Sequence, residues 1–228
     1  MKNVAIIPAR GGSKRIPRKN IKSFNGRPMV AWAIKCALET GLFKDIIVSS
    51  DDEEILNISK SEGATVLIKR SLELADDYTP TVPVIANALE IYNTTNNTPS
   101  NACCIYPCSP FLKPDDLANS FELFDQSKAS FLYPVGLYSH PIQRSMKMDK
   151  DGKMHFRYPE HELSRTQDLE DLYHDMGQFY WGKTDAWLTG MRMHTDGVGY
   201  KVQSWRFVDI DTLDDWERAE SYQKIIDS

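Results

Sequence analysis

Glycine and basic residues are concentrated in one short segment near the N-terminus. Residues 10–20 read Arg-Gly-Gly-Ser-Lys-Arg-Ile-Pro-Arg-Lys-Asn. Adjacent glycines let backbone N–H groups turn toward an anion, and Arg and Lys side chains add charge-assisted hydrogen bonds to phosphate oxygens. The order fits neither G-x-x-x-x-G-K-[ST] nor G-x-G-x-x-G, so both familiar phosphate fingerprints are absent. The segment therefore predicts an anion site, with a basic surface loop as the alternative.

Two aspartates near the C-terminus, Asp209 and Asp211, form the second group that could do chemistry. We expect a strand at 207–210, in which residues two apart share a face, so both carboxylates lie side by side beyond its end. Carboxylate oxygens suit Mg²⁺, which also takes nucleotide oxygens. The alternative is an acidic turn into a helix. Thr212 and Asp215 have the spacing of a capping box. We therefore assign Asp214 and Asp215 to helix initiation, and only the first two aspartates to metal.

Composition predicts one domain spanning residues 1–228, because 41% hydrophobic residues can bury a full core. The net charge of -5 argues against nucleic-acid binding, although nine of the 27 basic residues precede the first acidic residue, Glu39. The apolar run 4–7 is too short for a signal peptide or a membrane span. We expect a cytoplasmic protein without a membrane partner, whose four cysteines remain thiols.

Strands and helices alternate along the first half of the chain. We expect strands at 4–7, 45–50, 64–68 and 102–106, and helices at 28–41, 52–62, 79–92 and 114–127. This order predicts an α/β, Rossmann-like, mostly parallel sheet with helices on both faces. Ligands of such sheets bind beyond the carboxyl ends of strands, so the loops after residues 7, 50, 106 and 210 are the expected site.

The regular pattern is interrupted between about residues 131 and 182. Proline, glycine, histidine and charged residues break every run there, and residues 150–152 are typical of a hairpin turn. We interpret this stretch as an insertion on the main sheet. Beyond it we expect strands at 199–205 and 207–210 and a last helix at 213–226.

The segment 10–20 resembles the CTP-binding loop of the acylneuraminate cytidylyltransferase family. The resemblance covers nearly the whole chain and rests on separate segments at 7–20, 26–29, 48–52, 107–110, 140–141, 165–168 and 209–212. Within the family, the chain most resembles the members that activate pseudaminic acid. The resemblance implies a fold of the nucleotide-diphospho-sugar transferase type and transfer of CMP from CTP to the anomeric hydroxyl of a nonulosonic acid.

The resemblance also implies roles for individual residues. Arg10 and Lys19 would hold the β- and γ-phosphates and, with Asp211, form the catalytic set. Asp209 and Asp211 would bind Mg²⁺, the implied cofactor. The residues expected to contact CTP are Ala9, Arg10, Gly11, Gly12, Ser13, Lys19, Asn20 and Asp77.

Departures from the family pattern fall on the sugar side. Gln143 stands where many sialic acid enzymes carry the lysine of His-Pro-x-Lys, and Tyr106 stands where they carry a glutamine. The reaction therefore carries over better than the exact sugar, and N-acetylneuraminic or legionaminic acid remain alternative acceptors. The residues expected to contact the sugar are Tyr106, Gln143, Arg144, Arg165, Gln167 and Tyr180.

Two further implications concern assembly and chemistry. The stretch 131–182 resembles the family's dimerisation extension, which reaches the partner's active site, so a homodimer is expected. A module that binds CTP without chemistry is the alternative from another class. That alternative leaves Asp209 and Asp211 without a role.

Overall fold

The apolar run near the N-terminus forms β1 (Asn3–Pro8), the centre of the sheet. The computed structural model describes residues 3–226. On one side, β1 pairs in parallel with β4 (Asp45–Ser50), which pairs in parallel with β5 (Val66–Lys69). On the other side, β1 pairs in parallel with β6 (Asn101–Ile105). The sequence prediction of these four strands is confirmed, with shifts of one or two residues at their ends.

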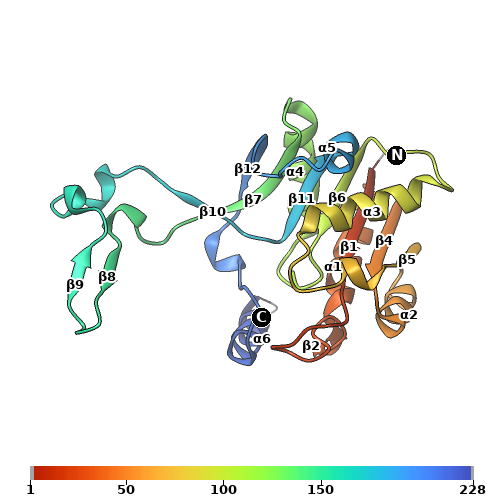
Figure 1. Cartoon of the computed structure of the whole chain (residues 1–228), viewed down its shortest axis with the longest axis horizontal. Coiled ribbons are helices and arrows are strands. Elements are labelled where there is room, and N and C mark those ends of the chain that lie inside the picture. The colour runs from red at the N-terminus through yellow and green to blue at the C-terminus, as the bar shows by residue number, and fades with distance from the viewer. Residues whose placement is uncertain (1–2, 227–228) are drawn as a thin grey trace.

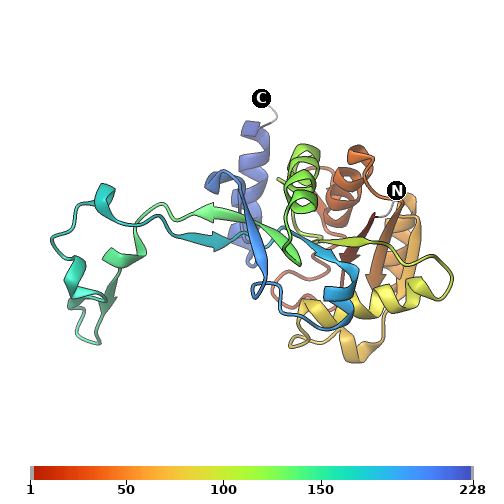
Figure 2. The same cartoon turned by 90° about the horizontal axis from the view of Figure 1, so that it is seen from above.

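Helices cover both faces of this sheet, as expected. One face carries α1 (Met29–Thr40), α2 (Glu53–Ser61) and α4 (Pro114–Gln126). The other carries α3 (Thr81–Asn93) and the short α5 (Thr184–Leu188). Seen from above in Figure 2, α4 and α1 lie on one side of the strands and α3 and α5 on the other.

Side chains of β1 alternate between the two faces. Ala5 and Ile7 pack into the cluster with α1, α2 and α4, whereas Val4 and Ile6 pack into the cluster with α3 and α5. All four are at most 1% exposed. A strand covered on both faces reads as a continuous apolar run, which explains the pattern 4–7.

Four later strands extend the sheet beyond β6. β11 (Phe179–Lys183) lies antiparallel to β6 and to the start of β7 (Phe131–Leu137). The end of β7 pairs with β10 (Tyr173–Asp175) antiparallel, and its other edge pairs with β12 (Gly197–Lys201) in parallel. The sheet order is β10-β7-β11-β6-β1-β4-β5, with β12 on the free edge of β7.

The insertion is shorter than expected from the sequence, because β7 and β11 belong to the main sheet. The part that projects from it is residues 138–172, which we call the arm (Figure 1). Its tip is the hairpin of β8 (Met146–Met148) and β9 (Met154–Phe156). The turn expected at 150–152 is confirmed, and Gly152 there adopts φ +81.

The expected strand 207–210 is wrong. Residues 207–211 form no ladder with any strand in the described part of the chain, and β12 ends at residue 201 rather than 205. The alternation of burial is retained nevertheless: Val208 and Ile210 are buried, and Asp209 is exposed. The last helix, α6 (Leu213–Ile226), lies where the sequence predicts it.

Short elements complete the description. β2 (Ser23–Phe24) and β3 (Arg27–Pro28) form a small antiparallel ribbon before α1. The 3-10 turns are Leu72–Leu74, Ile142–Arg144, Pro159–His161, Thr166–Asp168 and Ser204–Arg206. Among the described helices, none has both the length and the apolar character needed to cross a bilayer.

Candidate active site

A cavity of about 670 Å³ opens beyond the carboxyl ends of β1, β5 and β6. Its walls come mainly from the loops after these strands, from residues 177–178 before β11 and from the extended segment 207–211. The chain runs from β1 outward to β5 and returns to the other side of β1 at β6, so the cavity lies at a topological switch point. The loop after β4, also expected at the site, contributes no wall residue.

Basic side chains of the 10–20 loop converge on one carboxylate at this cavity. Arg10 Nη1 donates to Asp77 Oδ1 at 2.7 Å, and Lys14 Nζ lies 2.5 Å from Asp77 Oδ2. The hydrogen bonds from Lys14 and Arg10 hold the pKa of Asp77 below its usual range. Arg10 also donates to the carbonyl of Asp76 at 2.8 Å. Asp77, expected to contact CTP, is therefore a counter-ion of the cations that could bind phosphate oxygens.

Lys19 joins the loop to the aspartate segment. Its Nζ donates to the carbonyl of Ile210 at 2.7 Å and lies 3.6 Å from Asp211 Oδ1. Arg15 Nη2 lies 2.9 Å from Asp211 Oδ2. Residues 191 positions apart in the chain are thus brought into one electrostatic group.

Asp209 and Asp211 both line the cavity. Although the residue as a whole is exposed, desolvation of its carboxylate raises the pKa of Asp209. The negative charge of Asp211 adds to this rise, and Lys19 opposes it. No third His, Cys, Asp or Glu of the described residues joins them in a potential metal cluster. Mg²⁺ is typically held by one or two carboxylates together with substrate phosphates and water, so this pair fits that ion.

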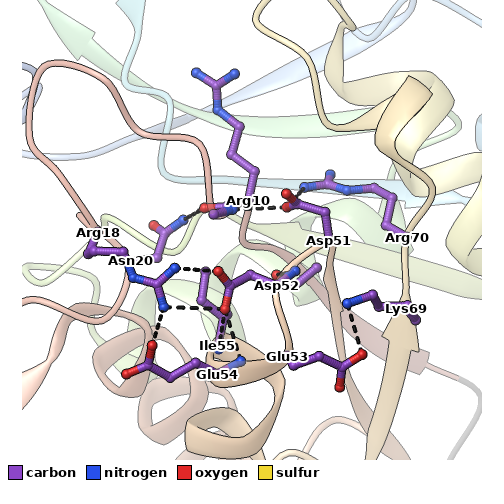
Figure 3. A network of polar contacts seen from close by, with 12 residues as sticks. Arg10, Arg18, Asn20, Asp51, Asp52, Glu53, Glu54, Ile55, Lys69 and Arg70 are labelled. Carbon is purple, nitrogen blue, oxygen red and sulfur yellow. Dashed lines mark hydrogen bonds and ion pairs between the residues drawn. The ribbon is translucent and has the colours of Figure 1, made fainter.

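The backbone of the 10–20 loop is held by the residues just before α2 and by the loop's own Asn20 (Figure 3). Gly11 N donates to Asp51 Oδ1 at 2.9 Å, and Asn20 Nδ2 donates to the carbonyl of Arg10 at 2.8 Å. A Cβ on Gly11 would lie 2.9 Å from the Cβ of Asp52, so only glycine fits this approach. Figure 3 shows the Arg10 side chain leading away from these contacts.

Arg18 provides the second attachment. It donates to both carboxylate oxygens of Asp52 and, at 2.5 Å, to Glu54 Oε2. The Asp52 carboxylate also caps α2 by accepting from the backbone N–H groups of Glu54 and Ile55. The hydrogen bond from Arg18 is the main reason why the pKa of Asp52 is lowered. One aspartate therefore joins the helix N-terminus to the loop.

A small apolar cluster fixes the loop to the C-terminal segment. Ile16 of the loop packs with Val208 and Ile210, and Trp216 of α6 and Phe111 complete the contact. Thr212 and Asp215 form the expected capping box of α6, with Asp215 N donating to Thr212 Oγ1 at 3.2 Å and Thr212 N donating to Asp215 Oδ2 at 2.9 Å. The alternating burial of 207–211 leaves the two aspartates on the cavity side.

The structure brings together most of the expected CTP and metal residues. Those that line the cavity are Arg10, Ser13, Lys19, Asn20, Asp77, Asp209 and Asp211. Ala9 is fully buried, and Gly11 and Gly12 lie in the same loop without lining the cavity.

The expected sugar residues are divided between two places. Tyr106 lines the cavity, and its hydroxyl lies 2.6 Å from Thr81 Oγ1. Tyr180 is buried behind it and donates to Asp175 Oδ2 at 2.9 Å, so it does not reach the cavity.

The other four expected sugar residues lie on the arm, away from the cavity of the same chain (Figures 1 and 2). Gln143 donates to the carbonyl of Glu170 at 3.0 Å. Arg165 is paired with Asp168 at 2.7 Å, and both are exposed. Arg144 and Gln167 lie in the neighbouring 3-10 turns.

Sequence reasoning missed several wall residues, notably Arg70, Thr81, Cys108 and Gln178. Arg70 follows the last residue of β5, so its place after a parallel strand was the available signal. Cys108 was interpreted only as a buried thiol; its Sγ lies 3.5 Å from Asn20 Oδ1, and burial raises its pKa to about 11.

Comparison with known proteins identifies the family. The sequence profile of the cytidylyltransferase family matches residues 4–204. The chain is 39% identical to the pseudaminic acid cytidylyltransferase of Campylobacter jejuni subsp. jejuni serotype O:2, over 99% of this chain and 97% of that protein. The chain belongs to the cytidylyltransferase family. The matched profile ends before Asp209, so this aspartate pair is supported by geometry rather than by the profile.

One more distant relative agrees with this assignment, and one solved structure shares the fold. N-acylneuraminate cytidylyltransferase A of Danio rerio is 30% identical over 95% of this chain and 49% of that protein. The solved structure of a CMP:2-keto-3-deoxy-manno-octonic acid synthetase complexed with CTP superposes with a TM-score of 0.71, at 15% identity, covering 98% of this chain and 99% of that one. The latter likeness confirms the α/β fold.

Proposed function

We propose that this cytidylyltransferase transfers CMP from CTP to the anomeric hydroxyl of pseudaminic acid, releasing pyrophosphate. The observation that carries the proposal is the convergence of the basic 10–20 loop and the Asp209–Asp211 pair on one cavity, through Lys19. The named activity of the full-length relative from Campylobacter jejuni supports this choice of acceptor.

The basic side chains supply what the leaving group requires. Displacement at the α-phosphorus develops charge on the departing pyrophosphate, and preorganised cations stabilise that charge. Arg10 and Lys14 are already directed at a carboxylate, Asp77, and the incoming triphosphate would replace it as their partner. The acceptor hydroxyl attacks directly, so no covalent enzyme intermediate is required.

We propose that Asp209 and Asp211 hold Mg²⁺ together with oxygens of the triphosphate. When bound, the ion would supply charge stabilisation at the phosphates and increase the acidity of the attacking hydroxyl. Arg15 and Lys19, now paired with Asp211, would then be free to contact phosphate oxygens. Asp209, which carries no ion pair of its own among the described side chains, would be the primary carboxylate ligand.

A homodimer is the proposed working form. The arm projects from the sheet and exposes large apolar side chains: Met146, Met148, Met154 and Leu163. In a dimer these would be covered, and Arg165 and Gln143 would be supplied to the partner's cavity. The four free thiols would suit a reducing compartment, and we propose the cytoplasm.

The deciding experiment incubates the folded protein with CTP, Mg²⁺ and a mixture of pseudaminic, legionaminic and N-acetylneuraminic acids. Mass spectrometry should detect CMP-pseudaminic acid as the main product, with pyrophosphate released in equal amount. A different CMP-sugar as the main product would show that another of the three acids is the acceptor. CTP binding without any product would favour the non-catalytic module.

A further inference from the structure

Segment 207–211 carries both aspartates of the site, yet it forms no ladder with any strand of the described chain. The direction of its backbone therefore depends on single contacts at its two ends. At the downstream end, Lys19 Nζ donates to the carbonyl of Ile210 at 2.7 Å. Asp211 N donates to Asp215 Oδ2 at 3.2 Å. The upstream end needs contacts of its own.

Arg206, three residues before Asp209, is buried and supplies the first of these contacts. Its Nη1 donates to Asp116 Oδ1 at 3.0 Å, and its Nη2 donates to the other oxygen of the same carboxylate. Nη2 also donates to the carbonyl of Phe111 at 3.0 Å. Asp116 lies in the first turn of α4, where it accepts from Lys113 N at 3.0 Å. The guanidinium therefore attaches the start of the segment to α4 and to the loop after β6.

Gln178 holds the backbone of the same residue. The Gln178 side chain is 3% exposed, and its Nε2 donates to the carbonyl of Arg206 at 3.0 Å. The backbone carbonyl of Gln178 accepts from Tyr106 N at 2.9 Å and from Ser109 Oγ at 3.3 Å. Both the side chain and the backbone of Arg206 are thus held by elements that lie outside segment 207–211.

The geometry of the Arg206–Asp116 pair suits positioning better than stabilisation. A buried ion pair loses the hydration of both charges, and apolar side chains of similar volume often stabilise a fold as well or better. Arg206 Nε is also buried without a hydrogen-bond partner among the described residues, which adds to the cost. A bidentate guanidinium provides a fixed direction, which apolar side chains do not provide.

These upstream contacts do not involve the groups that meet the substrate. Arg206 and Asp116 do not line the cavity, whereas Lys19 does and lies 3.6 Å from Asp211 Oδ1. In the proposed function, Lys19 turns to phosphate oxygens when CTP binds, so the downstream contacts change. The contacts of Arg206 are independent of that exchange.

We propose that Arg206 is a positioning residue that fixes segment 207–211, so that both aspartates face the cavity while CTP binds. The inference rests on the proposed function, because it takes Asp209 and Asp211 as ligands of a divalent cation. Only two residues separate Arg206 from Asp209, so a displaced Arg206 displaces the carboxylate that carries no ion pair of its own.

Arg206→Met combined with Asp116→Asn tests the proposal. The double variant removes both charges together, so neither is left buried alone, and the Asn oxygen can still accept from Lys113 N. Isothermal titration calorimetry without sugar acid measures the Kd of CTP in EDTA and in Mg²⁺. The affinity in EDTA reports on the 10–20 loop and should equal that of the wild type. The gain in affinity on adding Mg²⁺ should fall by about 10- to 100-fold, as is typical when the support of metal ligands is lost.

The matched control is Asp45→Asn. Asp45 accepts a hydrogen bond from the buried Tyr92 at 2.6 Å, and it lies at the opposite end of the sheet, where β4 begins. We expect this variant to lose some thermal stability and to keep the gain of the wild type with Mg²⁺. An equal loss of the gain in the control would overturn the proposal, since the effect would then follow from stability alone.

Gln178→Met keeps the test decisive if the double variant does not fold. It removes the hydrogen bond to the Arg206 carbonyl and keeps the length of the side chain. Loss of one neutral hydrogen bond corresponds to about two- to tenfold, and we expect the gain with Mg²⁺ to fall by that factor. A gain equal to that of the wild type in the double variant, or in Gln178→Met where only this variant folds, would overturn the proposal. Weaker CTP binding in EDTA with an unchanged gain would also overturn it, since Arg206 would then support the nucleotide site instead.

Failure of the proposed function would give a different result. A wild type that binds CTP equally well in EDTA and in Mg²⁺ would refute the metal site itself, and the role of Arg206 with it. A normal gain in both the wild type and the Arg206 variant would refute only the role of Arg206.

Discussion

The two aspartates of the site differ in how their charge is balanced. Asp211 is paired with Arg15 and Lys19, whereas the strongest charge effect on Asp209 is the unfavourable one from Asp211. Asp211→Asn should lower kcat by about 10²- to 10³-fold, because the variant loses a charge that orients Arg15 and Lys19 and that, in our proposal, also holds the metal. Steady-state kinetics at saturating CTP and Mg²⁺ measure this. Asp214→Asn is the control: it makes the same change in the first turn of α6 and should keep full activity.

Asp209 should be unfavourable for the stability of the ligand-free protein. Its pKa is raised in the fold, so the native state holds this proton more tightly than the unfolded chain. The contribution of Asp209 to the free energy of unfolding therefore falls as pH rises from the ordinary aspartate pKa, about 3.9, through the raised pKa of the folded state. Asp209→Asn should melt slightly above the wild type at pH 7, with the difference vanishing below about pH 4. A lower melting temperature at pH 7 would contradict this.

At the scale of elements, the start of α2 controls the geometry of the 10–20 loop. Asp52 caps the helix and binds Arg18, which itself adopts φ 57 in the loop. Asp52→Asn keeps a good cap but loses the ion pair, so KM for CTP should rise several-fold with little change in melting temperature. Asp52→Ala should show the same KM effect and lose about 1 kcal/mol more stability. Equal KM values for CTP in the wild type and Asp52→Asn would show that the loop is independent of Arg18.

The elements that sequence predicts well are those whose signals are local. Residues within the element itself predict β1 by its apolar run, the start of α2 by its cap Asp52, and the end of α1 by the left-handed Gly41. The strand expected at 207–210 failed because a strand requires a neighbour, and pairing is not encoded within the segment. The insertion boundaries failed for the same reason, since β7 and β11 pair with each other and with distant strands.

The site residues also divide into those with a local sequence signal and those without one. Residue type and spacing singled out the glycines of the 10–20 loop and the aspartate pair, and the resemblance to the family supplied their expected roles. Gln178 and Thr81 reach the cavity only through the packing of distant elements, and no local pattern marks them.

At the scale of the whole molecule, the arm separates the expected sugar residues from the cavity that would need them. Arg165 and Gln143 lie on the arm beyond the main sheet, whereas Tyr106 lies in the cavity (Figure 1). A chain in isolation thus brings together most of the expected CTP residues and only part of the expected sugar residues at its cavity. If the arm serves a partner's cavity, each complete site combines residues of two chains.

Mixing two inactive variants tests this arrangement. Arg165→Ala leaves its own cavity intact but carries a defective arm, and Asp211→Asn carries an intact arm beside a defective cavity. In a mixed dimer, the intact cavity of the first chain meets the intact arm of the second. Random mixing makes about half of the dimers mixed, with one complete site in each, so activity should recover to about a quarter of the wild type. Mass spectrometry checks that the subunits exchange. If they do and the activity stays at the level of the separate variants, Arg165 either acts in the site of its own chain or lies outside the site. Activity that recovers in the mixture although the subunits do not exchange would also exclude a shared site.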